Sequence, residues 1–495
     1  MRKEPLLLGI DIGTSACKAA LFCPDGSVLA QESESYGVFY PQTGWAEQDP
    51  DAWWKAVCVA LNALMEKHHI DPRNIVGIGI DGQSWSAIPI AKDGKCLHNT
   101  PIWMDTRSEE ICRELNRNIG EDKIFNVCGN PLQPTYTLPK ILWYKQNRPE
   151  IYEKADKILQ SNSYIALKLT GAVTQDISQA YGLHCFNMRL GKWDEALCHE
   201  MGIRRSLLPE IFKCHEVIGK VTEQAARECG LHPGTPVVAG GLDAACGTLG
   251  AGVLRDGETQ EQGGQAGGFS ICMNTYAADP SLILSYHVVP GTWLLQGGTV
   301  GGGGILKWLA SELWPNSDFN ALTKAAEQVP AGSDGLVFLP YMAGERSPIW
   351  DPKAKGVYYG LDFAKTRGHI VRASLEGAAY ALRHNLEIAE GAGAKVSRMR
   401  AMGGAANSKL WTQIKSDITG KPIDVPSADT ATTLGTAMLA GVAVGVYKDF
   451  EEAVANTVIT RRTHEPDDTK AAVYNHNYET YIELYKNLKS LMQRG

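Results

Sequence analysis

The chain has 495 residues, of which 44% are hydrophobic and 21% charged, and its formal net charge at pH 7 is −7. This size predicts two large domains or three smaller ones, each with enough apolar residues for a core. The acidic balance argues against binding to nucleic acid or to an anionic membrane. The twelve cysteines show no Cys-x-x-Cys pair or zinc-type spacing, and no apolar run approaches the length of a membrane span. We therefore expect reduced thiols, a cytoplasmic location and no membrane partner.

The first candidate site is the turn after an apolar strand predicted over residues 5–11. Asp11 ends this strand, and Gly13, Thr14 and Ser15 form a small, partly hydroxylic turn. Gly13 lets the backbone approach a ligand, and the amides and hydroxyls of Thr14 and Ser15 can donate to phosphate oxygens. Asp11 can hold a hydrated Mg²⁺ beside those phosphates. The alternative is an ordinary β-hairpin in which Asp and Gly serve only the turn.

Strands and helices alternate along the rest of the first half, which predicts an α/β architecture. Two of the strands lead to further candidates: one is followed by Gln83, Ser84 and Trp85, and another by Asp243 at the start of a helix. The predicted strands lie at 17–23, 27–34, 74–80 and 236–239, and helices are predicted at 50–67 and over most of 105–170.

The second half repeats the opening pattern, because residues 259–272 again show strand, glycine turn and strand. Gln265 and Ala266 follow Gly264 where the first turn has two hydroxylic residues. This repeat near the middle of the chain favours a duplicated domain, with the boundary near residue 254. Two such hairpins facing each other would hold a triphosphate from both sides.

Two further glycine clusters precede predicted helices. Residues 297–304 come before a helix at 305–313, where Gly303 would offer free backbone amides at a helix N-terminus. Gly404 and Asn407 belong to the second cluster, where an adenine ring can lie against the turn with Asn407 at its edge. For each cluster the alternative is close packing of a helix on a sheet.

Several segments together resemble the FGGY family of carbohydrate kinases, of the actin-like ATPase superfamily, over nearly the whole chain. The resemblance implies an α/β fold of two actin-like (ribonuclease H-like) ATPase domains with a cleft between them. Domain 1–254 would bind sugar and carry the catalytic base, and domain 255–495 would bind the nucleotide. The family's C-terminal signature is resembled by 356–361 and 369–377, the segment before it by 339–348, and the N-terminal signature, with departures, by 137–143.

The resemblance further implies ATP-dependent phosphorylation of a sugar hydroxyl, with ATP and Mg²⁺ as cofactors. Segments 45–50 and 101–107 are most similar to kinases of a ketopentose, D-xylulose, which would yield D-xylulose 5-phosphate. Asp243 matches the family's general base and Asp11 its metal-side carboxylate. Without the resemblance, a helix N-cap would be the simpler role for Asp243. The nucleotide-binding set would be Thr14, Ser15, Lys18, Gly264, Gln265, Gly303, Gly404 and Asn407.

Substrate contacts are expected where strands end on the same sheet edge as the base. Trp103 can face the apolar side of a sugar, and Asp105 can bind its hydroxyls. Gln83, Ser84 and Trp85 complete the expected sugar-binding set.

Three departures from the family pattern keep other functions open. Ser84-Trp85 replaces the usual Met-His, and Ala244 replaces an Asn after the base, so a kinase of another ketose, polyol or sugar acid is an alternative. The Gln265-Ala266 turn lacks the usual hydroxyl, which leaves a nucleotide-binding sensor or scaffold without turnover as a third possibility. Retention of Asp11, Lys18 and Asp243 argues against the third. A homodimer is a possible assembly.

Overall fold

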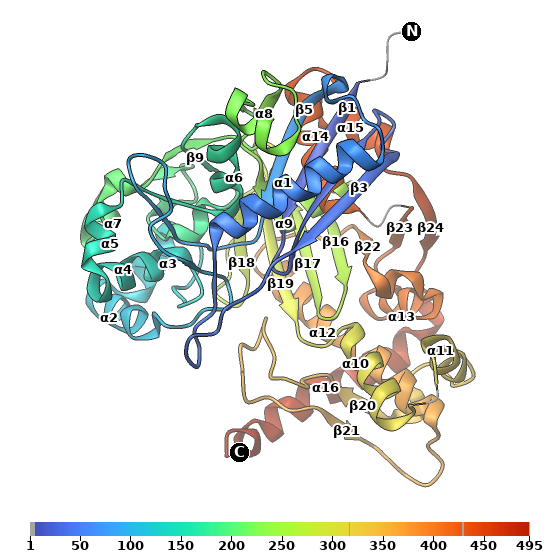
Figure 1. The fold of residues 1–495 in the computed structure, drawn as a ribbon. Helices are drawn as coiled ribbons and strands as arrows, with labels where there is room; N and C mark the ends of the chain where they lie inside the picture. The colour runs from blue at the N-terminus through green and yellow to red at the C-terminus, as the bar shows by residue number, and fades with distance from the viewer. Residues whose placement is uncertain (1–4, 316, 428–429, 495) are drawn as a thin grey trace. The chain divides into compact units, whose positions relative to one another are not determined.

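The computed structural model describes residues 5–315, 317–427 and 430–494, and it divides into two compact units (Figure 1). Unit 1 contains residues up to 254 together with 284–294 and 430–458, and unit 2 contains the rest. The chain therefore first leaves unit 1 after Leu254, where the sequence suggests a boundary, but two later segments return to unit 1. These returns are not part of the expected division into 1–254 and 255–495.

Unit 1 is built on a sheet with the strand order β13-β14-β5-β1-β2-β3, and β15 pairs with β5. β1, β2 and β3 are antiparallel neighbours, whereas β5 runs parallel to β1, β14 and β15. The ends of β1, β5 and β15 consequently meet at one sheet edge. The strands are β1 (Leu6–Ile12), β2 (Ala16–Phe22), β3 (Val28–Ser35), β5 (Ile75–Gly82), β13 (Val217–Lys220), β14 (Pro236–Val238) and β15 (Gly241–Leu242).

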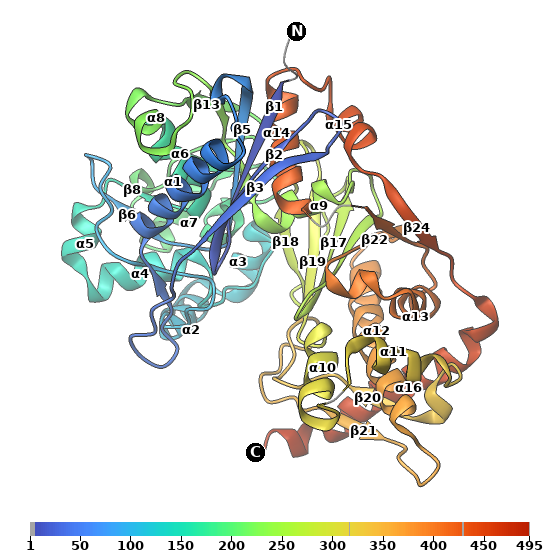
Figure 2. The same ribbon diagram turned by 45° about the vertical axis from the view of Figure 1, so that its right-hand side comes forward.

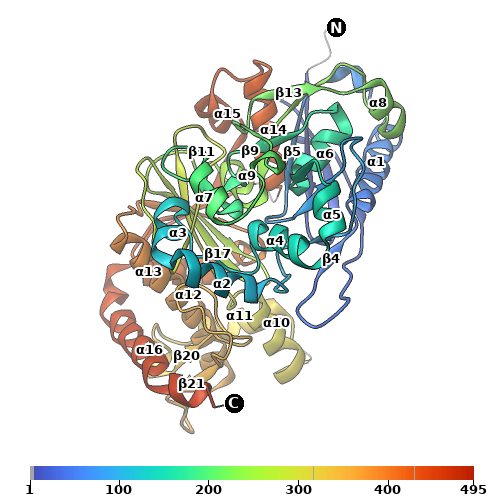
Figure 3. The same ribbon diagram turned by 90° about the vertical axis from the view of Figure 1, so that its left-hand side faces the viewer.

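Helices cover both faces of this sheet. On one face α1 (Pro50–Lys67) packs against β2 and β3, and it starts where Asp49 caps the helix by accepting from the Asp51 amide. On the other face α14 (Ala431–Ala443) packs against β1, β5 and α9 (Asp243–Gly250), as Figures 1 and 2 show. Figure 3 faces the helices inserted between α1 and α9: α2 (Glu109–Ile119), α3 (Glu121–Cys128), α4 (Thr137–Asn147), α5 (Pro149–Lys154), α6 (Ser161–Thr170), α7 (Glu195–Glu200) and α8 (Glu223–Cys229).

Glycines in the strands allow the backbone of α14 to approach the sheet closely. A Cβ atom on Gly79 would overlap the carbonyl oxygen of Thr436, and one on Gly9 would overlap that of Thr433. These obstacles are backbone atoms of a buried helix, which cannot rotate away as a side chain can. The contact therefore depends on the absence of a side chain at both positions.

We expect Gly79→Ala to lower the free energy of unfolding by about 1–3 kcal/mol, because overpacking shifts α14 away from the sheet. Urea denaturation followed by circular dichroism measures this change. Gly391→Ala is the matched control, since a Cβ there, at the end of α12 (Arg367–Gly391), would meet no atom within 4 Å. Equal midpoints for the two variants would contradict the close packing.

Unit 2 repeats the strand arrangement of unit 1. Its sheet includes the order β19-β17-β16-β22-β23-β24, in which β16 is antiparallel to β17 and parallel to β22, and β22 is parallel to β23. The same relations join β1 to β2 and β5, and β5 to β14, so the repeated hairpin belongs to a repeated sheet. The strands are β16 (Glu258–Gly263), β17 (Gly267–Met273), β19 (Trp293–Thr299), β22 (Arg398–Met402), β23 (Ile423–Pro426) and β24 (Thr460–His464).

The helix predicted at 305–313 is present: α10 (Gly303–Trp308) continues directly into a π-helical segment over Leu309–Leu313. The other helices are α11 (Phe319–Glu327), α13 (Lys409–Thr419), α15 (Phe450–Thr457) and α16 (Ala471–Met492). The short strands are β4 (Glu47–Gln48), β6 (Ile88–Ile90), β7 (Thr100–Pro101), β8 (Lys157–Leu159), β9 (Thr174–Asp176), β10 (Phe186–Asn187), β11 (Lys192–Trp193), β12 (Glu210–Phe212), β18 (Ile283–Tyr286), β20 (Val337–Leu339) and β21 (Val357–Tyr359). Among the described residues, no helix is both long and apolar enough to cross a membrane.

Candidate active site

Three aspartates lie at the edge of the unit 1 sheet where β1, β5 and β15 end. The strand register places Asp11 beside Asp81, and Asp81 beside Gly241, two residues before Asp243. Asp243 is the first residue of α9, and its carboxylate accepts from the Ala244 amide at 2.6 Å. The helix N-cap position belongs to Leu242, so Asp243 is not a simple N-cap.

Burial is the main influence on these three carboxyl groups. It raises the pKa of Asp243 to about 7, and the negative charge of Asp11 adds to the rise. Burial and the charge of Asp11 raise the pKa of Asp81 well above its usual value, although Thr436 donates a hydrogen bond to Asp81. Burial also raises the pKa of Asp11, against the opposing effects of Asp81 and Lys18. Asp81 is therefore the group that keeps a proton, which leaves Asp11 the anion available to a cation.

The first turn is braced by side chains from several loops. Tyr36 donates to the Gly13 carbonyl at 2.6 Å, and the amide of Gln48 donates to the Thr14 carbonyl at 2.8 Å. The indole N–H of Trp103 donates to the Thr14 hydroxyl oxygen at 2.9 Å. With that oxygen engaged as an acceptor, the hydroxyl hydrogen of Thr14 is left to donate elsewhere. The Gly13 amide already donates to the Ala16 carbonyl at 3.2 Å, so the turn is held with the Thr14 hydroxyl as a donor available to an anion.

The other predicted residues of unit 1 differ in accessibility. Ser15 and Lys18 are exposed. Gln83 is buried, and its amide donates to the Gln48 side chain at 2.7 Å. Among the described residues the Oε1 atom of Gln83 has no hydrogen-bond partner. Gln83 therefore links the turn to the next strand end and retains one free acceptor.

Ser84 and Trp85 adjoin a group of aromatic rings. Trp85 has a left-handed backbone, with φ of 61°, and its ring centroid lies 4.4 Å from that of Tyr136 and 6.1 Å from that of Tyr181. The hydroxyl of Tyr181 lies near Ser84 and Trp85 and within the electrostatic influence of Asp243. This places an apolar surface in the neighbourhood of the candidate base.

Asp105 does not sit as the sequence suggests. It is fully buried, and both its oxygens already accept hydrogen bonds, from Arg107 and from the Ala46 amide. Arg107 also pairs with Glu47 at 2.7 Å and stacks over the ring of Trp45 at 3.8 Å. A sugar hydroxyl would have to displace one of these donors, so the geometry gives Asp105 a bracing role. Trp103, in contrast, is 37% exposed.

The expectation of free amides at Gly303 is wrong. The amide of Gly303 donates to the Gly264 carbonyl at 2.8 Å, and that of Gly304 donates to the Gln265 carbonyl at 2.9 Å. The second turn thus rests on the start of α10 and uses its amides. The sequence does not predict these hydrogen bonds because the two glycine clusters are distant in sequence and come into contact only in the folded protein.

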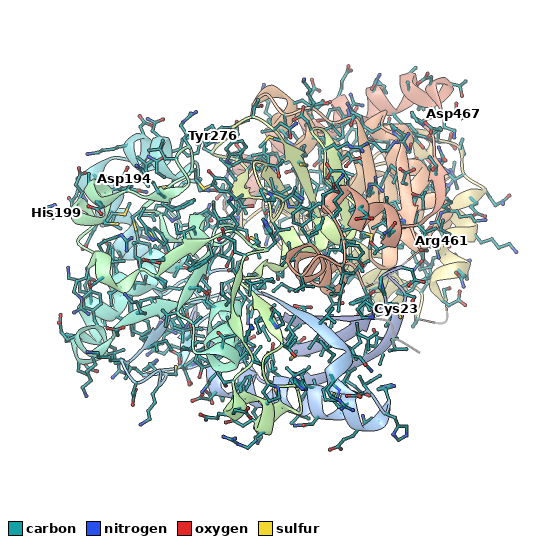
Figure 4. All side chains as sticks on the ribbon, turned by 90° about the horizontal axis from the view of Figure 1, so that it is seen from above. Cys23, Asp194, His199, Tyr276, Arg461 and Asp467 are labelled. Atoms are coloured by element: carbon teal, nitrogen blue, oxygen red, sulfur yellow. The ribbon has the colours of Figure 1, made fainter. Side chains whose placement is uncertain are left out.

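The five nucleotide-site residues predicted in unit 2 nevertheless line one pocket of about 810 Å³. This volume lies within the range of small-molecule sites. Asn407, at the end of a short 3₁₀ turn, accepts from Arg461, which Figure 4 labels at the surface. The pocket is lined by Gly263, Gly264, Gln265, Gly303, Leu306, Lys307, Phe319, Asn320, Thr323, Glu327, Gly404, Ala405, Asn407, Ser408, Lys409, Leu410 and Trp411.

Sequence reasoning missed the residues that hold the site from behind. Gln48 lies in the family-like segment 45–50, so a signal for it was present. Tyr36, Tyr136 and Tyr181 had no such signal, because an aromatic residue between strands has no distinguishing pattern until its neighbours are known.

Comparisons with known proteins identify the family of this chain. The N-terminal domain of the FGGY family of carbohydrate kinases matches residues 6–250, and the C-terminal domain of that family matches residues 267–444. The chain belongs to the FGGY family of carbohydrate kinases. It is accordingly an ATP-dependent sugar kinase with the two-domain α/β, actin-like fold.

Two kinds of relative are equally similar to this chain. It is 31% identical to the xylulose kinase of Escherichia coli K12, over 98% of this chain and 100% of that protein. It is also 31% identical to the gluconokinase of Bacillus subtilis, over 98% of this chain and 96% of that protein. The crystal structure of xylulose kinase from Rhodospirillum rubrum superposes with a TM-score of 0.92, at 30% identity, and covers 99% of this chain and 100% of that one.

Proposed function

We propose that this FGGY kinase phosphorylates a ketopentose, D-xylulose being the first candidate, with Asp243 as the general base. The observation that carries this proposal is the position of Asp243, at a strand end beside Asp11, with its pKa raised to about 7. A base with a pKa near the working pH can both exist as the anion and accept a proton effectively. In the proposed step, Asp243 accepts the proton of the attacking sugar hydroxyl while the sugar oxygen bonds to the terminal phosphorus of ATP. The bond from that phosphorus to the bridging oxygen breaks, and ADP leaves with the electron pair.

Asp11 and Asp81 fit a hydrated magnesium ion better than a cation held by protein ligands alone. The described residues contain no group of three metal-ligating side chains, and Mg²⁺ usually keeps several waters and binds through one or two carboxylates plus phosphate oxygens. We propose Asp11 as the carboxylate that holds this ion. Protonated Asp81, which lies beside Asp11, would fix the orientation of the Asp11 carboxylate. Bound magnesium would neutralise phosphate charge during transfer.

Nucleotide binding is proposed for the unit 2 pocket and for the first turn of unit 1. The support in unit 2 is that Gly264, Gln265, Gly404 and Asn407 line one pocket of suitable size. Thr14, Ser15 and Lys18 supply donors and a positive charge in unit 1. Gly303 would contribute pocket surface only, since its amide is engaged.

A sugar acid is the second candidate substrate, because the gluconokinase relative is as similar as the xylulose kinase. A coupled assay of ADP release over D-xylulose, other ketoses, polyols and gluconate tests both. We expect the highest kcat/KM with D-xylulose. A higher kcat/KM with gluconate would make gluconate the substrate in place of D-xylulose. ATP turnover that no sugar stimulates would overturn the proposed function.

Two further properties stay predictions. All twelve cysteines are free thiols, which supports the proposed cytoplasmic location.

A homodimer is a proposal that light scattering of the purified protein can test.

The double variant Ser84→Met with Trp85→His is expected to change sugar preference. An indole offers an apolar face, whereas an imidazole offers a hydrogen bond to a hydroxyl, so the ratio of kcat/KM values should shift toward D-xylulose. The shift should be roughly 5- to 150-fold, since a buried polar group that gains or loses its hydrogen-bond partner changes the binding free energy by about 1–3 kcal/mol. The same sugar panel measures it. A uniform loss over all sugars would instead make Trp85 a packing residue.

A further inference from the structure

Lys140 is a buried cation that the mechanism above does not use. It lies on α4 and its side chain has no solvent exposure. Its ammonium group forms no ion pair with any residue that the structure describes; it donates instead to three backbone carbonyls, those of Trp85 at 2.9 Å, Ile102 at 2.7 Å and Thr135 at 2.6 Å. Three N–H groups thus meet three acceptors, which accounts for every donor of the ammonium.

The three carbonyls share one property: each belongs to, or directly precedes, an aromatic residue of the candidate sugar site. The first is that of Trp85 itself, the second precedes Trp103, and the third precedes Tyr136. Trp103 in turn donates to Thr14 in the first phosphate turn. The Nζ atom of Lys140 therefore bonds to three loops, at residues 85, 102 and 135, that are separate in the sequence.

The backbone at Trp85 explains why such a fixed point is needed. A φ of 61° is rarely adopted by a bulky side chain, and such a conformation persists only where the surroundings hold it. The Lys140 bond holds the carbonyl of this same residue. The ring of Trp85 rests against Tyr136, whose preceding peptide bonds to the same ammonium.

The electrostatic surroundings agree with a positioning role. Burial lowers the pKa of Lys140 to about 7, the charge of Asp105 opposes this decrease, and that of Arg107 adds to it. A buried ammonium is costly unless hydrogen bonds compensate it, and within the described part of the chain the three carbonyls provide that compensation. A residue that served packing alone could be apolar at less cost.

We infer that Lys140 is a positioning residue for sugar specificity, which fixes Trp85, Trp103 and Tyr136 relative to one another by binding their loops. The inference rests on the proposed function, because it requires a sugar to be bound beside Trp85 and Trp103, with Tyr136 buried against Trp85. It assigns no contact between Lys140 and the sugar.

The test compares Lys140→Gln and Lys140→Met with a control on the same helix, Lys145→Met. Lys145 also donates to a backbone carbonyl, that of Gly202, but it is exposed and bonds to none of the three loops. Each protein is assayed for kcat and KM with D-xylulose and gluconate, for ADP affinity by calorimetry, and for its unfolding midpoint.

We expect Lys140→Met to lower kcat/KM for the better sugar by roughly 10- to 100-fold, as misplacement of binding groups does, and to bring the values for the two sugars closer together. Lys140→Gln, which keeps two N–H donors, should fall between Lys140→Met and the wild type. ADP affinity should change less than kcat/KM in both, since Lys140 is linked to the proposed nucleotide-binding residues only through Trp103 and Thr14 of the first turn. Lys145→Met should resemble the wild type.

Three results would overturn the inference: an equal loss with both sugars, no loss at all, or failure of both Lys140 variants to fold, which would make Lys140 a structural residue of unit 1 as a whole. Because Lys140 acts through Trp85, adding Trp85→Ala to Lys140→Gln should lower kcat/KM by less than the product of the two single effects. A wild-type protein that phosphorylates neither sugar would contradict the proposed function itself, which is a different outcome.

Discussion

Asp243→Asn is expected to slow phosphoryl transfer by roughly 10²–10⁴-fold, the usual contribution of a general base. The amide keeps the shape of the side chain, and its oxygen can still accept from the Ala244 amide, so α9 should start normally. It cannot accept the proton of the sugar hydroxyl. Loss of kcat with little change in ADP affinity is therefore the expected pattern.

The pH dependence of the wild type should identify the same group. Asp243 acts as the anion, so kcat/KM should fall about tenfold per pH unit below about 7 and level off above it. When Mg²⁺ and ATP are saturating, the midpoint of the acid limb of this pH profile should lie at or below about pH 7, because a nearby cation favours the charged carboxylate. Asp93→Asn, in an exposed turn, is the control. Wild-type turnover in Asp243→Asn would exclude Asp243 as the base.

Asp11→Asn is expected to lower kcat/KM for ATP by roughly 10²–10³-fold, because a metal ion contributes several kcal/mol to charge stabilisation in such transfers. Removing this negative charge also removes one cause of the raised pKa of Asp243. The acid limb of the residual activity should consequently move to lower pH. Titration of activity with Mg²⁺ and a pH profile measure the two effects.

The same substitution should stabilise the fold above neutral pH. The pKa of Asp11 is higher in the folded protein than in the unfolded chain, so folding becomes less favourable as pH rises past the unfolded value. Asp11→Asn carries no such penalty, and its unfolding midpoint should exceed that of the wild type at pH 8. The difference should shrink as the pH falls through the unfolded value of about 4 and vanish toward pH 3, where both states keep the proton. A variant that is less stable at pH 8 would contradict the assigned direction of the pKa.

Local patterns in the sequence predict the strand ends and their carboxylates well. The hairpin at Asp11 and the strand before Asp243 combine short apolar runs with glycine and a polar tip, and such signals need no distant partner. The repeated hairpin at 259–272 was found in the same way. The residues that line the unit 2 pocket and were predicted individually each belong to or follow a glycine turn, and their role in nucleotide binding stays a prediction.

Features that depend on distant contacts could not be predicted. The amide of Gly303 is engaged by a turn some forty residues earlier in the printed sequence, between Gly264 and Gln265. Asp105 is enclosed by Arg107, which is nearby, but also by the Ala46 amide, which is not. Lys140 lies in the N-terminal signature, yet its three acceptors are backbone atoms, which leave no trace in residue types.

The return of residues 430–458 to unit 1 has a consequence for how the protein is made. Synthesis proceeds from the N-terminus, so the strands β1 and β5 emerge long before α14, which covers one face of them. Until α14 emerges, Gly9 and Gly79 face no helix, and apolar sheet surface stays open to other nascent chains. In the sequence, most residues of unit 2 come between the N-terminal segment of unit 1 and α14. The sheet of unit 2 is complete only after β24 has also been synthesised. Unit 1 therefore cannot complete its packing before most of the chain has been synthesised, and a chain interrupted at residue 254 would leave the ribosome without the helix that covers its sheet.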